Sequence, residues 1–229
     1  MKFAIEPFSL SDYPGKLSAV LFLLGCNLRC GYCHNPELVL PGMSGNFMDE
    51  EFLKTFLESR QGLLDGIVIC GGEPTIHHDL ESLIMLIKSY GFLVKLDTNG
   101  TNVHVVQNLI QKNLIDFVAL DVKHTLSKYE KVSPKVKIDL KSIQKTIQLL
   151  KENNVQYEMR STIVPGLHSE SDIHEMGLEI LGAQSWALQN FRRGKHIDES
   201  YAKKDSFTED EMQRFEKIAK RYAQNVTVR

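Results

Sequence analysis

Three cysteines stand close together in the first part of this 229-residue sequence, at Cys26, Cys30 and Cys33. Their C-x3-C-x2-C spacing lets one loop wrap around a compact metal centre. Thiolates are the usual protein ligands of iron–sulfur clusters, and three of them leave one iron of a [4Fe–4S] cube open to a substrate or cofactor. A structural zinc site with His34 or Cys70 as fourth ligand, or a thiol redox site, would also fit the spacing.

Further polar and glycine-rich clusters follow the predicted strands at their C-terminal ends. Gly71-Gly72-Glu73-Pro74, Asp97-Thr98-Asn99-Gly100 and Asp121-Val122-Lys123 come in this order, and Arg160 lies near the end of the fifth predicted strand. In parallel α/β folds the active site lies at that edge of the sheet, so we expect these clusters to converge. Taken singly, each cluster would also fit a βα turn or solvated surface charge.

Apolar runs alternate along the chain with segments of helical period. The predicted strands are Leu17–Leu24, Gly66–Cys70, Phe92–Asp97, Ile115–Asp121, Val155–Ile163 and Ser185–Phe191. The predicted helices are Asp49–Arg60, Leu80–Tyr90, Val103–Lys112, Leu140–Asn153, Ser171–Leu181 and Glu209–Ala223, the last opened by a capping box of Thr208 and Glu211. This alternation implies an α/β fold with parallel strands. Six units are too few for a closed barrel, so the pattern favours an open, partial (βα)6 barrel, and a doubly wound sheet also fits.

The composition is that of an ordinary globular protein, with 42% hydrophobic residues, 24% charged residues and a net charge of −2. This balance indicates neither a nucleic-acid surface nor a membrane surface. We expect a single domain over residues 1–229, with its core over residues 16–195, a C-terminal helix near residues 208–224, and loops at Pro41–Asn46 and Lys131–Lys137. The longest apolar run, Ala19–Leu24, is too short for a bilayer span, and no signal peptide is evident, so a cytoplasmic protein is expected.

The cysteine pattern, with Tyr32 before the third cysteine, resembles the C-x3-C-x-Φ-C signature of the radical SAM superfamily. This resemblance implies that Cys26, Cys30 and Cys33 hold a [4Fe–4S] cluster. The open iron of that cluster would bind the amino and carboxylate groups of S-adenosylmethionine (SAM), and Tyr32 would lie against the adenine. The resemblance also implies a partial barrel of radical SAM type.

The later motifs resemble those of one branch, the enzymes that activate glycyl-radical enzymes. GGEP, DTNG, D-[LVI]-K and an Arg before a VPG turn (here Arg160 and Val164-Pro165-Gly166) occur in that order, and His34 follows the triplet as in that branch. The residues implied in SAM binding are Tyr32, Cys33, His34, Gly71, Gly72, Glu73, Asp97, Asn99, Asp121, Lys123 and Arg160. Glu73 would pair with the SAM ammonium, and Lys123 and Arg160 with its carboxylate. Some members bind a monovalent cation, which makes Asp97 and Asp121 its candidate ligands.

Longer stretches resemble the activating proteins of anaerobic ribonucleoside-triphosphate reductase. These stretches, all within residues 8–195, are SDYPGK, GCNLRCGYCHNPELV, RQGLLDGIVICGGEPT, GFLVKLDTNG and YEMRSTIVPGL. The segment 189–194 (QNFRRG) resembles the branch's Q-x-F-R-x-G, where a pyruvate formate-lyase activase is expected to carry a His. Cys70 stands where relatives commonly carry Ser or Thr and is expected to be a small buried residue at a strand end. A pyruvate formate-lyase type of activase and a radical SAM enzyme acting on a small molecule stay open as alternatives.

The resemblance implies a reaction driven by the cofactors, with no catalytic side chain of its own. Flavodoxin or ferredoxin would reduce the cluster, which passes one electron to SAM. Cleavage of SAM then gives methionine and a 5′-deoxyadenosyl radical, which takes a hydrogen atom from a backbone glycine of the partner. The expected partner is the large subunit of anaerobic ribonucleotide reductase, and neither a nucleic acid nor a membrane is expected to bind.

Overall fold

The computed structural model describes residues 2–40 and 47–229, and all six predicted strands form in it. They are β2 (Ser18–Leu23), β3 (Gly66–Gly71), β4 (Leu93–Thr98), β5 (Phe117–Asp121), β6 (Gln156–Ile163) and β7 (Ala183–Asn190). The predicted number of strands is nevertheless too low, because β1 (Phe3–Ser9) and β8 (Ala223–Val228) also form. The order of the strands in the sheet is β1 to β8, as in the sequence, so the sheet is open and does not close into a barrel.

The six predicted helices also form, five of them within two residues of their predicted bounds, whereas the last ends four residues before its predicted end. They are α2 (Glu50–Arg60), α3 (Leu80–Ser89), α4 (Val103–Gln111), α5 (Leu140–Glu152), α6 (Glu170–Glu179) and α7 (Glu209–Ala219). Shorter helices were not predicted, namely α1 (Pro36–Val39), η1 (Pro74–Ile76), η2 (Leu126–Lys131) and η3 (Glu199–Lys203). The capping box of Thr208 and Glu211 is confirmed. No helix among the described residues is long and apolar enough to cross a membrane.

The predicted loops have different outcomes. Pro41–Asn46 lies outside the described residues. In the second predicted loop, Lys131 is the last residue of η2, and residues 132–137 form neither helix nor strand.

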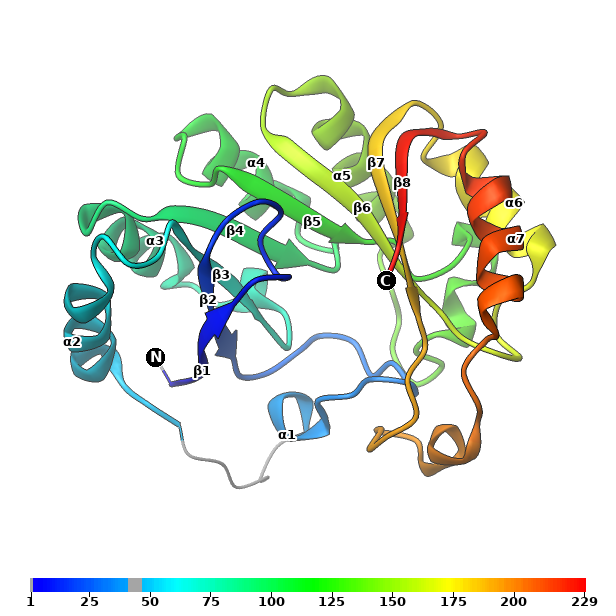
Figure 1. Cartoon of the computed structure of the whole chain (residues 1–229), viewed down its shortest axis with the longest axis horizontal. Coiled ribbons are helices and arrows are strands. Elements are labelled where there is room, and N and C mark those ends of the chain that lie inside the picture. Colours follow the sequence, from blue (N-terminus) through cyan, green and yellow to red (C-terminus); the bar gives the residue numbers. More distant parts are fainter. Residues whose placement is uncertain (1, 41–46) are drawn as a thin grey trace. The chain divides into compact units, whose positions relative to one another are not determined.

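The chain divides into two compact units, and the prediction of a single domain stays a prediction. Unit 1 comprises Met1–Asn27, Glu37–Thr98 and His104–Val118. In it β2, β3 and β4 are parallel, and β1 pairs antiparallel with β2. The register of β1 shifts between Glu6 and Ser9, around Pro7, which has no N–H to donate and therefore suits an edge strand. Figure 1 shows α2 and α3 of this unit next to these strands.

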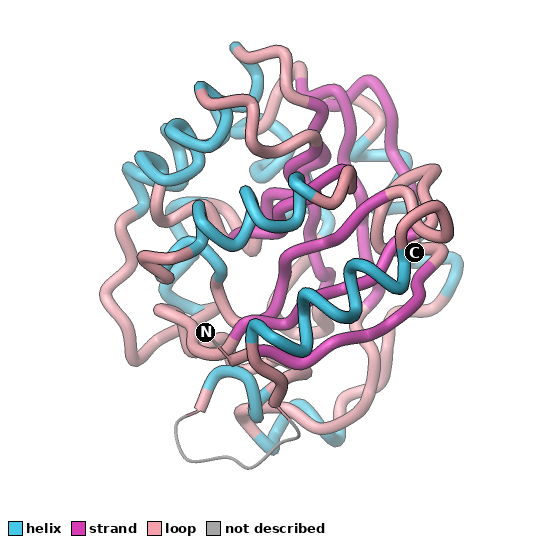
Figure 2. Tube along the Cα trace, turned by 90° about the vertical axis from the view of Figure 1, so that its left-hand side faces the viewer, coloured by secondary structure: helices cyan, strands magenta, loops and turns pink. Residues whose placement is uncertain are grey.

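Unit 2 comprises Leu28–Pro36, Asn99–Val103 and Ala119–Arg229. Its strands β6, β7 and β8 are parallel, and α6 and α7 lie side by side with α7 next to β8 (Figures 1 and 2). Gly177 of α6 allows this packing, because a Cβ atom there would lie 2.2 Å from Cδ2 of Tyr222. Trp186 of β7 is fully buried, and its Nε1 donates to Ser161 Oγ at 3.0 Å.

Candidate functional site

The three cysteines of the triplet fall into both units. Cys26 follows β2 in unit 1, whereas Cys30 and Cys33 belong to unit 2. The backbone N–H of Cys33 donates to the carbonyl of Cys30 at 3.0 Å, so a tight turn joins these two residues. Among the described residues no group of three His, Cys, Asp or Glu side chains is placed to hold a metal ion. The convergence of the three thiolates therefore stays a prediction.

In unit 1 the glycines of the GGEP motif make room for the chain on which Cys26 stands. A Cβ atom at Gly72 would lie 1.9 Å from the carbonyl oxygen of Gly25 and 3.2 Å from Cβ of Cys26. Gly71 has a φ of +121°, and a Cβ atom there would lie 2.3 Å from the backbone of Leu23. Both positions therefore require glycine for contact between backbones. Their contact with a cofactor stays a prediction.

Glu73 is almost fully buried and is held by neutral donors. Its Oε1 accepts hydrogen bonds from the Thr75 N–H at 3.1 Å, the Thr75 hydroxyl at 2.5 Å and the Thr98 hydroxyl at 2.7 Å. The backbone N–H of Glu73 donates to the carbonyl of Gly25 at 2.8 Å. The GGEP motif, the end of β4 and the chain before Cys26 thus meet within unit 1, as the sequence predicted for that edge of the sheet.

Asp97 and Asn99 are engaged within the protein. Asp97 forms a buried ion pair with Lys95, two residues earlier on the same face of β4, at 2.5 Å. Asn99 closes a turn, because its Oδ1 accepts from the Thr101 N–H at 3.0 Å and from the Thr101 hydroxyl at 2.7 Å. The sequence assigned these oxygens to SAM, or to a cation at Asp97, and did not identify Lys95. Both assignments stay predictions.

In unit 2 the side chain of Asp121 lies between two cations. Oδ1 of Asp121 accepts from Nε of Arg160 at 2.7 Å, and Oδ2 accepts from Nζ of Lys123 at 2.9 Å. Burial alone would raise the pKa of Asp121, but the charges of Arg160 and Lys123 outweigh burial and hold that pKa well below its ordinary value. The structure therefore brings together three predicted site residues. They pair with one another, whereas the sequence assigned the two cations to a SAM carboxylate.

Two tyrosines surround this group of charges. The Tyr129 hydroxyl accepts from the Lys123 N–H at 3.1 Å and donates to the Asp121 carbonyl at 3.3 Å, which fixes the backbone of the DVK motif. Tyr32 is 6% exposed, and its hydroxyl has no hydrogen-bond partner among the described residues. Burial raises the pKa of Tyr32 well above its ordinary value, against the nearby charge of Lys123. Tyr32 of the cysteine motif and Lys123 of the DVK motif are therefore neighbours.

Two neighbouring histidines, whose rings are tilted against each other, also lie at the DVK motif. The rings of His124 and His168 lie 4.8 Å apart. Nδ1 of His168 accepts from the Val164 N–H at 3.0 Å, so its Nε2 carries the proton and donates to the Lys123 carbonyl at 3.0 Å. Burial lowers the pKa of His168 to about 4 and also lowers that of His124. The sequence did not identify either histidine, and His168 is part of the VPGLH turn beside the predicted Arg160.

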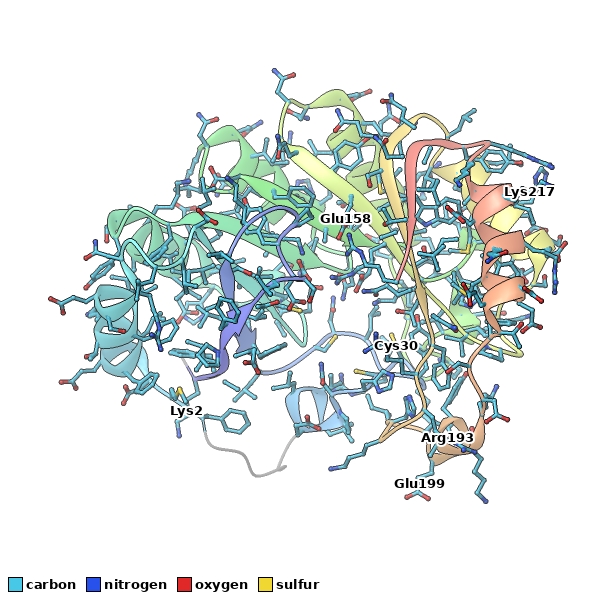
Figure 3. The ribbon with its side chains drawn as sticks, in the orientation of Figure 1. Lys2, Cys30, Glu158, Arg193, Glu199 and Lys217 are labelled. Atoms are coloured by element: carbon cyan, nitrogen blue, oxygen red, sulfur yellow. The ribbon has the colours of Figure 1, made fainter. Side chains whose placement is uncertain are left out.

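His34 lies against the segment that follows β7. Its ring centroid is 4.3 Å from that of His196 and 6.0 Å from that of Phe191, and the ring also forms a hydrogen bond with the Arg192 backbone. The HNP and QNFRRG motifs are therefore in contact within unit 2. Figure 3 shows Cys30 on its loop and Arg193 on this following segment. His196 was not identified from the sequence.

Cys70 stands near the end of β3 in unit 1. It is partly buried and packs against the apolar cluster of Tyr13, Val20, Val68 and Phe117. This placement agrees with the expected role of a small core residue at a strand end.

Comparison with known proteins defines the class of this protein. The model of the Radical SAM superfamily matches residues 20–178, more than half of the chain. The protein therefore belongs to the Radical SAM superfamily. Streptococcus suis SuiB bound to S-adenosylmethionine has a similar structure, with a TM-score of 0.67 and 16% sequence identity, covering 92% of this chain and 51% of that one. That likeness confirms the predicted α/β fold of radical SAM type.

Two relatives show to which family within the superfamily this chain belongs. A Methanocaldococcus jannaschii protein named "Putative glycyl-radical enzyme activating enzyme" is 40% identical over 98% of this chain and 94% of its own length. The pyruvate formate-lyase-activating enzyme of Clostridium pasteurianum is 30% identical over 72% of this chain and 68% of its own length. The chain is thus a radical SAM enzyme of the glycyl-radical-enzyme activase family.

The cofactors of this superfamily are a [4Fe–4S] cluster and SAM, as the cysteine triplet predicted, which favours them over zinc and thiol redox chemistry. The residues present fit them. Thiolates are the right donors for iron, and the buried Tyr32 hydroxyl beside Lys123 has no partner in the part of the chain that the structure describes. A polar ligand can supply that partner.

Proposed function

We propose that this protein installs a glycyl radical on the large subunit of anaerobic ribonucleoside-triphosphate reductase. The segment QNFRRG carries the proposal, because it has Phe191 and no His where a pyruvate formate-lyase activase is expected to carry one. Phe191 is fully buried and packs near His34, so this segment is part of the structure around the cysteine loop. The resemblance of the longer stretches supports the same target.

In this proposal Cys26, Cys30 and Cys33 hold the cluster, and the residues implied by the resemblance bind SAM. Bound together, the reduced cluster and SAM would supply the one-electron chemistry that removes a hydrogen atom from the partner's glycine. The residues of the chain orient and shield these groups. Asp121 fixes the positions of Lys123 and Arg160, which would face an anionic group of SAM.

Other parts of the proposal follow from the same resemblance. Flavodoxin or ferredoxin is the proposed electron donor, and the cytoplasm is the proposed compartment. The proposal also includes a monovalent cation near Asp97 and Asp121. There it would share these carboxylates with Lys95, which lies beside Asp97, and with the two cationic side chains beside Asp121.

The test is anaerobic activation of two candidate partners in parallel, the reductase large subunit and pyruvate formate-lyase. Reconstituted protein, SAM and a chemical reductant are mixed with each, and EPR measures the glycyl radical doublet. We expect the doublet on the reductase subunit and a loss of at least about 100-fold in Cys30→Ala, because a thiolate ligand is removed. Cys70→Ala is the matched control, since Cys70 packs in an apolar cluster, and it should keep most of the signal.

A pyruvate formate-lyase activase is the second candidate, favoured by the 30% identity with the Clostridium pasteurianum enzyme. A doublet on pyruvate formate-lyase alone would establish that candidate and overturn the proposed target. A doublet on neither protein, together with release of 5′-deoxyadenosine, would point to another glycyl-radical partner and would also reject the proposed target.

A further inference from the structure

The segment from Phe191 to Lys203, here called the clamp, lies directly on the cysteine loop within unit 2. The Asp198 N–H donates to the carbonyl of Gly31 at 3.0 Å. A Cβ atom at Gly31 would lie only 2.9 Å from Cε2 of Tyr201. Gly31 separates Cys30 from Tyr32, so Tyr201 packs on the loop between two of the predicted cluster ligands.

Aromatic rings of the clamp contact the cysteine loop at two points. At one point the Tyr201 ring meets the edge of the Tyr32 ring, with centroids 6.2 Å apart. At the other, His196 lies 4.3 Å from His34, ring centroid to ring centroid, and is stacked on Phe191 at 5.0 Å. The clamp therefore holds the loop on both sides of Cys33.

The ring of His196 is buried. It is 6% exposed, and within residues 2–40 and 47–229 neither of its ring nitrogens has a hydrogen-bond partner. Burying a polar ring without hydrogen bonds costs free energy. We therefore assign the role of His196 to the packing of its ring. The ring fills the space between Phe191 and His34, and a ring without nitrogen could fill it equally well.

Lys204, the residue directly after the clamp, anchors its far end. Nζ of Lys204 donates to the carbonyl of Pro165 at 3.0 Å and lies 4.5 Å from the centroid of the Tyr201 ring. Nε of Arg193 donates to the carbonyl of Ala202 at 3.2 Å. Figure 3 shows the clamp folding back between its labelled Arg193 and Glu199. These contacts hold Tyr201 against Gly31.

We propose that the clamp sets the shape of the cysteine loop and covers it, with Tyr201 and His196 as positioning residues for cluster retention. This inference rests on the family assignment of a cluster to Cys30 and Cys33, and it does not depend on which partner is activated. Loss of a contact that orients a metal ligand typically weakens metal binding by about 10- to 100-fold.

The test is the rate at which reconstituted protein loses iron to a ferrous chelator under anaerobic conditions. We expect Tyr201→Ala to lose iron roughly tenfold faster than the unchanged protein, and Tyr201→Phe to match the unchanged protein, because the contacts belong to the ring. His196→Phe should also retain iron, whereas His196→Ala should not. Tyr90→Ala, at a partly exposed tyrosine of unit 1, is the matched control and should have no effect. The thermal midpoint of each apoprotein is measured alongside.

A second set of variants changes Gly31, which has a backbone φ that residues other than glycine also adopt. Gly31→Ala should speed iron loss through its contact with Tyr201, and in the Tyr201→Ala background the same change should have little further effect. Equal iron loss in Tyr201→Ala and Tyr201→Phe would overturn the proposed role of the clamp. Additive effects of the Gly31 and Tyr201 changes would overturn it as well. If the unchanged protein takes up no iron at all, the cluster assignment itself fails, a result distinct from both.

Discussion

Two carboxylates lie at strand ends, one in each unit, and they are held by different chemistry. Glu73 follows β3 and takes hydrogen bonds from Thr75, two residues later, and from Thr98 of the neighbouring strand β4. Asp121 ends β5 and forms ion pairs with Arg160 of the neighbouring strand β6 and with the side chain two residues later. The geometric arrangement is the same, but neutral hydroxyl and amide donors hold one carboxylate and cations hold the other.

The two sets of partners differ in what they do for the carboxylate. Neutral donors fix the direction of Glu73 in a place where it is 1% exposed. Cations fix Asp121 and also balance its charge, and its side chain is 26% exposed. Removing one partner of a buried ion pair leaves an unbalanced charge, whereas removing one neutral donor loses a single hydrogen bond. The two units should therefore respond to matched substitutions by different amounts.

The largest expected effect is that of Arg160→Met. This change leaves the carboxylate of Asp121 with the single cation Lys123, and it should lower the free energy of unfolding by about 3 kcal/mol, at the low end of the range for a broken buried pair because Asp121 is partly exposed. Urea unfolding of the reduced apoprotein measures it. The fluorescence of Trp186, the one tryptophan of the sequence, reports on unit 2.

The double variant Asp121→Asn with Arg160→Met is the control for that prediction. Because it removes the carboxylate together with the cation, it should recover more than half of the loss. If the double variant is as unstable as the sum of its two single changes, the ion pair does not account for the effect of Arg160→Met.

The second expected effect concerns pH, and it should appear in unit 2. The pKa of His168 is lowered by burial from 6.5 to about 4, so between these values the unfolded chain binds a proton that the folded chain does not. Stability should therefore be complete above pH 6.5 and should fall as the pH drops toward 4, by roughly 3 kcal/mol at most. The lowered pKa of His124 acts in the same direction.

Asp121 has a separate pH window. Its lowered pKa contributes stability above its ordinary value of 3.8, which is lost only below that value. Urea midpoints followed by Trp186 fluorescence from pH 7.5 to 4 measure the histidine window. His168→Gln keeps an N–H donor for the Lys123 carbonyl without titrating, so it should flatten the slope. An unchanged slope in that variant would show that His168 stays protonated or plays no part.

The fold could be predicted from the sequence wherever the buried apolar residues show the pattern of a strand or of an amphipathic helix. The six strands from β2 to β7 were predicted within about two residues at each end, because their buried apolar runs contrast with amphipathic helices. The strand β1 was missed because Pro7 and Glu6 interrupt it, and both are tolerated at an edge. The strand β8 was missed because most of its residues are exposed, so it carries no apolar run, and the predicted helix was extended through Ala223.

Candidate site residues could be named from the sequence where they belong to a short motif. Residues close in the sequence, such as Asp121 and Lys123, could be named together from one motif, but the ion pair with Arg160 joins residues 39 apart. Lys95 and His168 were missed because nothing local marks them, and their role comes from tertiary contacts with Asp97 and with the backbone of the DVK motif. Pairing between charges on different strands depends on side-chain geometry that the sequence pattern does not contain.

The smallest expected effect lies in unit 1, and its size can be compared with the loss of stability in Arg160→Met. Thr98→Val removes one hydroxyl donor from Glu73 while keeping the shape of the side chain, and two hydrogen bonds from Thr75 still hold Oε1 in place. The free energy of unfolding should fall by about 1.5 kcal/mol, the low end of the range for a hydrogen bond to a charged group, measured by urea unfolding followed by circular dichroism. Thr55→Val, at an exposed position of α2, is the matched control and should change it by less than about 0.5 kcal/mol. A loss in Thr98→Val as large as that in Arg160→Met would mean that the charge of the donor does not distinguish the two carboxylates, because a single hydroxyl would then contribute as much as a guanidinium.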